Sequence, residues 1–142
     1  MGAPSVATMT TNTTTATANA IGLIVSDLPA AMSFYAVLGV RFGPVAGDGH
    51  VDADLGAGFR LMLDTEDSIR SFHPEWVAPT GSSRAAVAFM ADAPATVDTL
   101  AAALVEAGGT EVLAAWDAPW GQRYATVADP DGNNVDLYAA LA

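Results

Sequence analysis

The stretch "DAPWGQRYATVADPDGNNVDLY", residues 117–138, decides the fold, because two strand patterns and a tight turn follow one another within it. Residues 121–129 form a strand candidate, "PDG" at 130–132 favours a turn, and residues 133–141 read as a further strand. Alternation points one carboxylate of this last segment, Asp136, toward the inside of the fold. A buried carboxylate without a partner is strongly disfavoured, so the rest of the chain must supply one.

The residues before this stretch complete a β-α-β-β-β pattern. "RAAVAFMA", residues 84–91, is a short apolar run typical of a buried strand. Residues 92–109 carry apolar side chains at helical spacing between Pro94 and a Gly-Gly pair, and residues 110–116 form another strand candidate. The second half of the chain is therefore predicted to fold as one strand, one helix and three strands.

The first half repeats this pattern. Residues 20–25 predict a buried strand, and residues 26–39 predict a helix with Asp27 as N-cap, Tyr35 on its apolar stripe and Gly39 as its end. Three short strand candidates follow, at residues 40–46, 50–56 and 59–64. The repeat predicts an α+β fold of two tandem β-α-β-β-β modules that form a curved mixed sheet around a cleft.

The repeat also predicts the domain organisation. Residues 18–142 form a single domain, with module one at about 18–64, a linker at 65–83 and module two at about 84–141. Residues 1–17 are rich in Thr and Ala and offer little apolar surface, so we expect a disordered tail there.

Composition excludes several function classes. The net charge of −11 and the five arginines without any lysine disfavour nucleic-acid binding. No apolar run is long enough to cross a bilayer, and the absence of cysteine excludes disulfides and thiolate sites. The start of the chain lacks the pattern of a secretory signal, so we expect a soluble, cytoplasmic protein.

Two segments resemble the vicinal oxygen chelate superfamily, the fold of glyoxalases, bleomycin resistance proteins and extradiol dioxygenases. They are "GLIVSDLPAAMSFYAVLGVRF" at residues 22–42 and "WGQRYATVADPDGNNVDLY" at residues 120–138, and the resemblance covers about residues 19–141. It implies paired modules and, in many members, a homodimer. It does not imply one reaction, because the superfamily includes lyases, dioxygenases, epimerases, thiol transferases and drug-binding proteins.

The same resemblance implies four positions at which enzymatic members hold a divalent metal. Three of them carry no ligand side chain here, namely Ala20, Met62 and Ala86, or Ala85 if the register shifts by one, and only Asp136 remains. One carboxylate does not hold a metal against water, and His50 and His73 are expected to be solvent-exposed. The resemblance therefore predicts no metal and no cofactor.

Aromatic side chains remain as the main candidates for ligand contacts. Trp76 lies in the linker, while Trp116 and Trp120 bracket "DAP" just before the strand candidate that begins at residue 121. The alternative role of Trp116 and Trp120 is to cover a sheet edge or a dimer interface. Met62 supplies a soft wall. Alternation leaves open whether Arg123 alone or Gln122 with Tyr124 faces the cleft, and whether Asp136 pairs with Arg123, with Arg84 or with a ligand amine.

The predicted function is metal-independent binding of a small molecule, aromatic or cationic and antibiotic-like, by Trp76, Trp116, Trp120, Met62, Arg123 and Asp136. The alternative is a lyase, isomerase or dioxygenase-like enzyme with Asp136 as general base or residual metal ligand. A third alternative is a structural or partner-binding domain whose cleft is filled by its own side chains.

Overall fold

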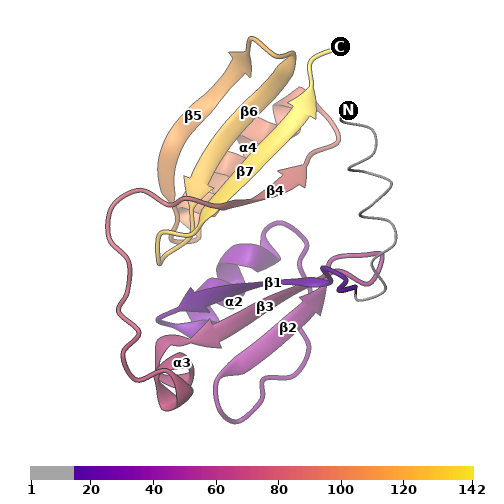
Figure 1. The fold of residues 1–142 in the computed structure, drawn as a ribbon. Helices are drawn as coiled ribbons and strands as arrows, with labels where there is room; N and C mark the ends of the chain where they lie inside the picture. The colour runs from indigo at the N-terminus through magenta and orange to yellow at the C-terminus, as the bar shows by residue number, and fades with distance from the viewer. Residues whose placement is uncertain (1–14) are drawn as a thin grey trace, which may run out of the picture.

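The computed structural model describes residues 15–142, and the chain contains two sheets and three helices within this range (Figure 1). The tail predicted at residues 1–17 lies mostly outside the described residues, and residues 15–17 are exposed without regular structure. None of the helices in residues 15–142 is long and apolar enough to span a membrane. The elements are β1 (Ala20–Val25), α2 (Leu28–Ala36), β2 (His50–Asp54), β3 (Arg60–Thr65), α3 (Glu66–Phe72), β4 (Ala86–Met90), α4 (Pro94–Glu106), β5 (Thr110–Ala118), β6 (Gln122–Ala128) and β7 (Asn134–Ala140).

The first module is a three-stranded mixed sheet with α2 on one face. Its strand order is β1-β3-β2, with β1 parallel and β2 antiparallel to β3. Asp27 caps α2 by accepting a hydrogen bond from the backbone N–H of Ala30 at 3.0 Å, and Pro29 occupies the first turn. As predicted, Tyr35 lies in the core, fully buried beside Phe34.

The second module repeats this arrangement with one strand more. The order is β4-β7-β6-β5, where β4 is parallel to β7 and the other pairs are antiparallel. Helix α4 packs on β5, β6 and β7 and buries Val97 and Leu104. The two modules, each one helix on a mixed sheet, confirm the predicted α+β class.

Two details differ from the sequence prediction, one in the first module and one in the linker. Residues 40–46 do not form a regular strand but make only isolated bridges, Phe42 with Ala53 and Ala46 with His50. Pro44 lies in this segment and has no backbone N–H to give to a ladder. The linker contains the short helix α3, which begins after the N-cap Thr65.

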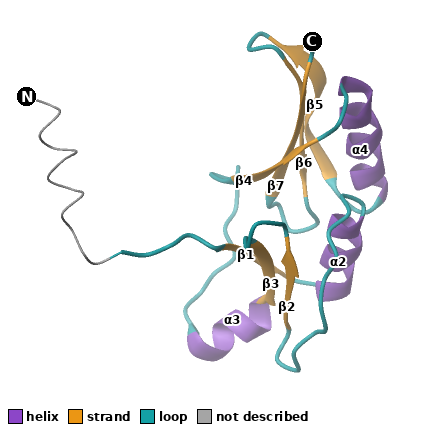
Figure 2. Ribbon diagram, turned by 90° about the vertical axis from the view of Figure 1, so that its right-hand side faces the viewer, coloured by secondary structure: helices purple, strands orange, loops and turns teal. Residues whose placement is uncertain are grey.

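Both modules share one hydrophobic core. Figure 2 shows α2 and α4 on the same side of the two sheets, while α3 lies on the other side. The hydroxyl of Tyr35 donates a hydrogen bond to Oδ2 of Asp129 at 2.8 Å, and Asn133 donates from Nδ2 to the carbonyl of Ile24 at 3.3 Å. These two hydrogen bonds join residues of different modules. Because α2 and α4 lie on one side, the other face of each sheet is free of these two helices.

Candidate functional site

Three aromatic rings meet on the face of the second sheet that α4 leaves open. Trp116 of β5 stands opposite Tyr124 of β6, and Trp120 lies in the turn between these strands. The ring centroids of Trp116 and Trp120 are 5.6 Å apart, those of Trp120 and Tyr124 5.4 Å apart, and both pairs meet edge to face. Trp116 is 37% exposed and Trp120 58% exposed, so both indoles offer surface to a ligand.

The carboxylate of Asp136 lies next to this aromatic cluster (Trp116, Trp120 and Tyr124). Asp136 on β7 is paired with Thr126 on β6, and it accepts hydrogen bonds from the hydroxyls of Thr126 at 2.7 Å and Tyr124 at 2.5 Å. Burial raises the pKa of Tyr124 above its ordinary value, and the hydrogen bond to Asp136 adds to the rise. Tyr124 therefore remains a protonated donor at neutral pH, and the two hydroxyls fix the direction of the carboxylate.

Arg123 is directed to the other face of the sheet. Its guanidinium donates two hydrogen bonds to Asp98 of α4, at 2.9 and 2.7 Å, and one to Asp117 at 3.0 Å. Of the two alternatives left open by alternation, the structure therefore selects Gln122 with Tyr124 for the open face. Among the described residues, no arginine or histidine forms an ion pair with Asp136.

The two other predicted ligand contacts lie in or beside the first module. Met62 is on the open face of the first sheet, where its sulfur accepts a hydrogen bond from Nη2 of Arg60 at 3.5 Å. Trp76 lies in the linker with the guanidinium of Arg70 5.0 Å from its ring centroid. The structure thus brings together Trp116, Trp120 and Asp136, but it places Trp76 and Met62 elsewhere.

The positions implied for a metal do not carry a donor set that fits one. Ala20 and Met62 belong to the first sheet and Ala86 and Asp136 to the second, and only Asp136 has an oxygen ligand. Within residues 15–142, no three histidine or carboxylate side chains are grouped so that they could hold a metal ion. Because a divalent cation needs several such ligands, the side chains at these four positions do not fit a metal site.

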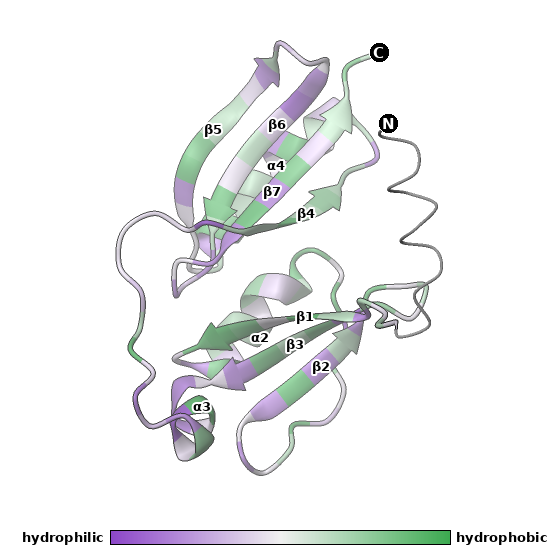
Figure 3. Ribbon diagram, viewed as in Figure 1, coloured by the Kyte–Doolittle hydropathy of each residue, from purple (hydrophilic) through white to green (hydrophobic). Residues whose placement is uncertain are grey.

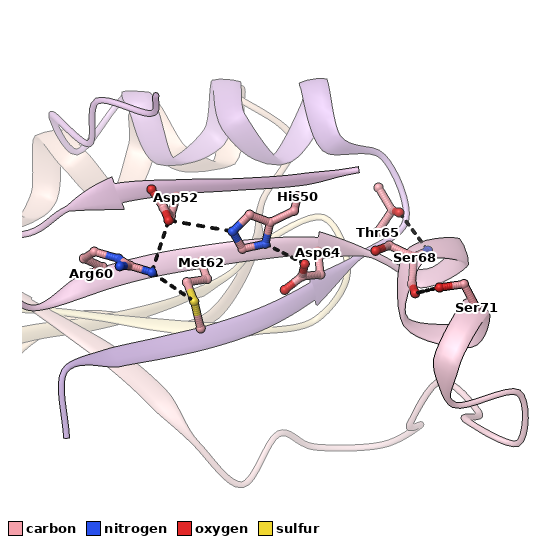
Figure 4. A network of polar contacts seen from close by, with 8 residues as sticks. All are labelled: His50, Asp52, Arg60, Met62, Asp64, Thr65, Ser68 and Ser71. Atoms are coloured by element: carbon pink, nitrogen blue, oxygen red, sulfur yellow. Dashed lines mark hydrogen bonds and ion pairs between the residues drawn. The ribbon is translucent and has the colours of Figure 1, made fainter. Parts of the chain in front are cut away.

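The first sheet carries a polar network that the sequence does not predict (Figure 4). His50 of β2 stands opposite Asp64 of β3, and its Nδ1 donates a hydrogen bond to Oδ1 of Asp64 at 2.7 Å. Asp52 lies 3.7 Å from Nε2 of His50 and 3.1 Å from Nη2 of Arg60. The His50 side chain is one-third exposed rather than fully solvated, whereas His73 is exposed, as expected. The alternation in "HVDAD" indicates that His50 and Asp52 share one face of a strand. It does not predict the strand register that places Asp64 opposite His50.

This network predicts a shifted titration of His50. The hydrogen bond from His50 to Asp64 raises the pKa of the imidazole above 6.5 and outweighs desolvation, with smaller contributions from the charge of Asp64 and from Asp52. The resulting stabilisation is present below the unfolded pKa of about 6.5 and is lost as the pH rises through the folded pKa. In a His73→Gln variant, which leaves one imidazole, NMR titration should give a midpoint above 6.5.

Two further variants test whether the hydrogen bond to Asp64, and not the negative charge of the chain in general, raises the pKa of His50. Asp64→Asn should lower the midpoint of His50, while Asp67→Asn, at a fully exposed carboxylate of α3, should leave it nearly unchanged. A midpoint at or below 6.5, or one that does not respond to Asp64→Asn, would contradict the prediction.

Known proteins of the same fold provide an independent comparison. Structures that superpose on the chain include a glyoxalase-related enzyme from Fulvimarina pelagi, with 24% identity, 88% coverage of each chain and a TM-score of 0.76. TioX from Micromonospora sp. ML1 has 23% identity, covers 89% of this chain and 100% of its own, and has a TM-score of 0.60. A lactoylglutathione lyase from Agrobacterium tumefaciens has 22% identity, covers 90% and 96%, and has a TM-score of 0.62.

At these identities the superpositions establish the fold and no activity. A search of curated protein sequences finds no match. The sequence profile of one family, however, matches residues 17–137, a range that runs from just before β1 into β7 and so includes both modules, the aromatic cluster and Asp136. The repeated architecture and this match lead to the same conclusion: the chain belongs to the Glyoxalase/Bleomycin resistance protein/Dioxygenase superfamily.

Proposed function

We propose that the chain binds a small aromatic or cationic molecule on the open face of the second sheet, without a metal, and holds it rather than transforming it. The observation that carries this proposal is the exposed aromatic cluster beside Asp136, a carboxylate with no basic partner among the described residues. Indole and phenol rings attract flat and cationic groups, and each cation–ring contact contributes about 0.5–2 kcal/mol. Asp136 then supplies the opposite charge for a ligand amine.

The geometry of Asp136 favours a binding role over a catalytic one. Each of its two oxygens already accepts a hydroxyl hydrogen bond, from Tyr124 and from Thr126, which fixes the carboxylate as an acceptor. A general base must instead reach and take a proton from its substrate. The alternative function, a metal-free lyase or isomerase with Asp136 as base, is retained as an outcome of the experiment below.

Binding of ethidium, a planar aromatic cation, should report on this site. We expect saturable quenching of tryptophan fluorescence, and weaker binding of phenanthridine, its uncharged ring system at pH 7.5. Trp120→Ala should weaken ethidium binding by about 2-fold to 30-fold, the range of one cation–ring contact. Asp136→Asn should weaken it by about tenfold or more, because a charge-assisted contact is lost.

Matched variants control for unspecific effects. Phe72→Ala removes an aromatic ring that is 74% exposed on α3, and Glu111→Gln removes a carboxylate that lines the groove between α4 and β5. Both should bind ethidium as the unsubstituted chain does. Equal affinity for ethidium and phenanthridine would contradict the cationic ligand class. If Asp136→Asn kept its ligand affinity but lost turnover in a lyase or isomerase screen, the alternative function, an enzyme with Asp136 as base, would be favoured.

We also propose that a second copy of the chain covers part of this face. Large apolar side chains remain exposed at both edges of the second sheet, with Met90 of β4 75% exposed and Val112 of β5 54% exposed. Figure 3 shows β4 as hydrophobic, and exposed apolar surface of this kind marks association sites. Sedimentation velocity at tens of micromolar should give a dimer that Met90→Glu dissociates. Val77→Glu, in the linker at a residue 79% exposed, should not dissociate it, and a monomeric parent chain would refute the dimer.

A further inference from the structure

A second cavity, separate from the aromatic cluster, lies where the two modules and the linker meet. Its volume is about 230 Å³, and its walls come from β1, from α3 and the linker, and from the turn between β6 and β7. In Figure 1 the linker rises from α3 toward β4 on the side where β1 ends and the β6–β7 turn lies. The lining side chains that carry chemistry are Glu66, Trp76, Asp131 and Asn133.

The charged side chains that line this cavity are both acidic. The carboxylate of Asp131 accepts no hydrogen bond from any described residue, and its Oδ2 atom is buried. Asp129 is bound to the backbone N–H of Asp131 at 2.9 Å, so a second carboxylate stands close by. None of the ion pairs among residues 15–142 includes either of them. Negative charge that is desolvated without a counter-charge is unfavourable, which makes a cation the complementary occupant.

The aromatic wall of the cavity suits the same occupant. Trp76 is partly buried and is held by Arg70, which contacts the ring at 5.0 Å and donates from Nε to the Trp76 carbonyl at 3.4 Å. The same arginine lies 3.7 Å from Oε1 of Glu66, so one side chain positions both lining residues. An indole beside carboxylates is a common arrangement for the recognition of ammonium groups.

We propose that this cavity binds a small organic cation, an ammonium or quaternary ammonium group, with Asp131 as its counter-charge and Trp76 as its aromatic wall. Glu66, which is paired with Arg70, also lines the cavity, and Gly22 and Ile24 supply apolar contact. The site shares no residue with the aromatic cluster of the second sheet, so the inference does not depend on the function proposed above.

The tryptophan content makes the site directly observable. The variant Trp116→Phe/Trp120→Phe leaves Trp76 as the only tryptophan of the chain. Titration with tetramethylammonium chloride, at ionic strength held constant with sodium chloride, should change the Trp76 emission with saturation. Neopentyl alcohol, a neutral molecule of similar shape, should produce no saturable change.

Substitutions in the same background identify the counter-charge. Asp131→Asn should weaken tetramethylammonium binding by about tenfold or more. Glu75→Gln, at an exposed linker carboxylate that does not line the cavity, should leave binding within about twofold, and thermal melting checks that both variants are folded. Equal weakening by the two substitutions, or an equal response to the alcohol, would overturn the proposal, as would a linear response without saturation.

The two proposals fail separately. Ethidium is tested on the chain with Trp116 and Trp120 intact, whereas tetramethylammonium is tested on the chain in which both are replaced. Loss of the ethidium response with a retained Trp76 response would refute the function proposed for the second sheet and leave the cavity assignment standing. A retained ethidium response with loss of the Trp76 response would refute the cavity assignment alone.

Discussion

Replacing Asp129 with alanine is expected to lower the free energy of unfolding by about 3 kcal/mol or more. Asp129 is 2% exposed and accepts four hydrogen bonds. The donors are the backbone N–H groups of Asp131 and Asn133, both at 2.9 Å, the Tyr35 hydroxyl at 2.8 Å and Nδ2 of Asn133 at 3.0 Å. Alanine would leave these donors without their acceptor around a buried position, and each costs about 1–3 kcal/mol when it stays unsatisfied.

Urea denaturation measures this change, and a neighbouring residue provides the control. Asp131→Ala removes a carboxylate of the same turn that accepts no hydrogen bond from described residues, so stability should be unchanged or higher. Tyr35→Phe removes one of the four donors and should lose only part of the energy lost in Asp129→Ala. Equal destabilisation by Asp129→Ala and Asp131→Ala would show that the hydrogen bonds of Asp129 do not stabilise the turn.

Replacing Gly109 with alanine is expected to destabilise the fold by about 3 kcal/mol, the upper part of the range for an added methyl group in a packed core. A Cβ atom at Gly109 would lie 2.6 Å from Cε1 of Phe34, 2.8 Å from Cγ1 of Val127 and 2.9 Å from the carbonyl oxygen of Ala128. Phe34 is fully buried and the Ala128 oxygen belongs to the backbone of β6, so neither can move away easily.

The matched control is Gly47→Ala, because a Cβ atom there has no neighbour within 4 Å. Its free energy of unfolding should stay within about 0.5 kcal/mol of that of the parent chain. Comparison of the two variants by thermal and urea unfolding separates the steric effect from the general difference between Gly and Ala. If Gly109→Ala were as stable as Gly47→Ala, the contact between α2 and β6 would accommodate the added methyl group, and the prediction would be wrong.

The paired modules could be predicted because the sequence signals for them are local. Apolar runs, a helix with Pro in its first turn, and Gly at its end occur twice in the same order, and the structure confirms this α+β architecture. The prediction of a strand at residues 40–46 is wrong. Their apolar spacing fits a strand, but Gly43 and Pro44 interrupt the ladder, and only bridges remain.

The candidate site was predictable only in part, because alternation tells which residues share a face but not what each face contacts. The residue types and positions of Trp116, Trp120 and Asp136 predict ligand contacts, and the structure places the three side chains close together. The direction of Arg123 depends on Asp98, which is 25 residues away on α4. The place of Trp76 depends on the path of the linker, which has no periodic pattern to predict it.

The contact between Tyr35 and Asp129 links residues that are 94 positions apart and belong to different modules. Phe34, the neighbour of Tyr35, closes the same boundary against Gly109 and Val127. Separated from each other, one half would expose Phe34 and Tyr35 to water, and the other would leave Asp129 without the Tyr35 hydroxyl, one of its four donors. The internal duplication is therefore not a pair of autonomous units: each half completes the folding of the other, and the chain should gain and lose its structure as one cooperative whole.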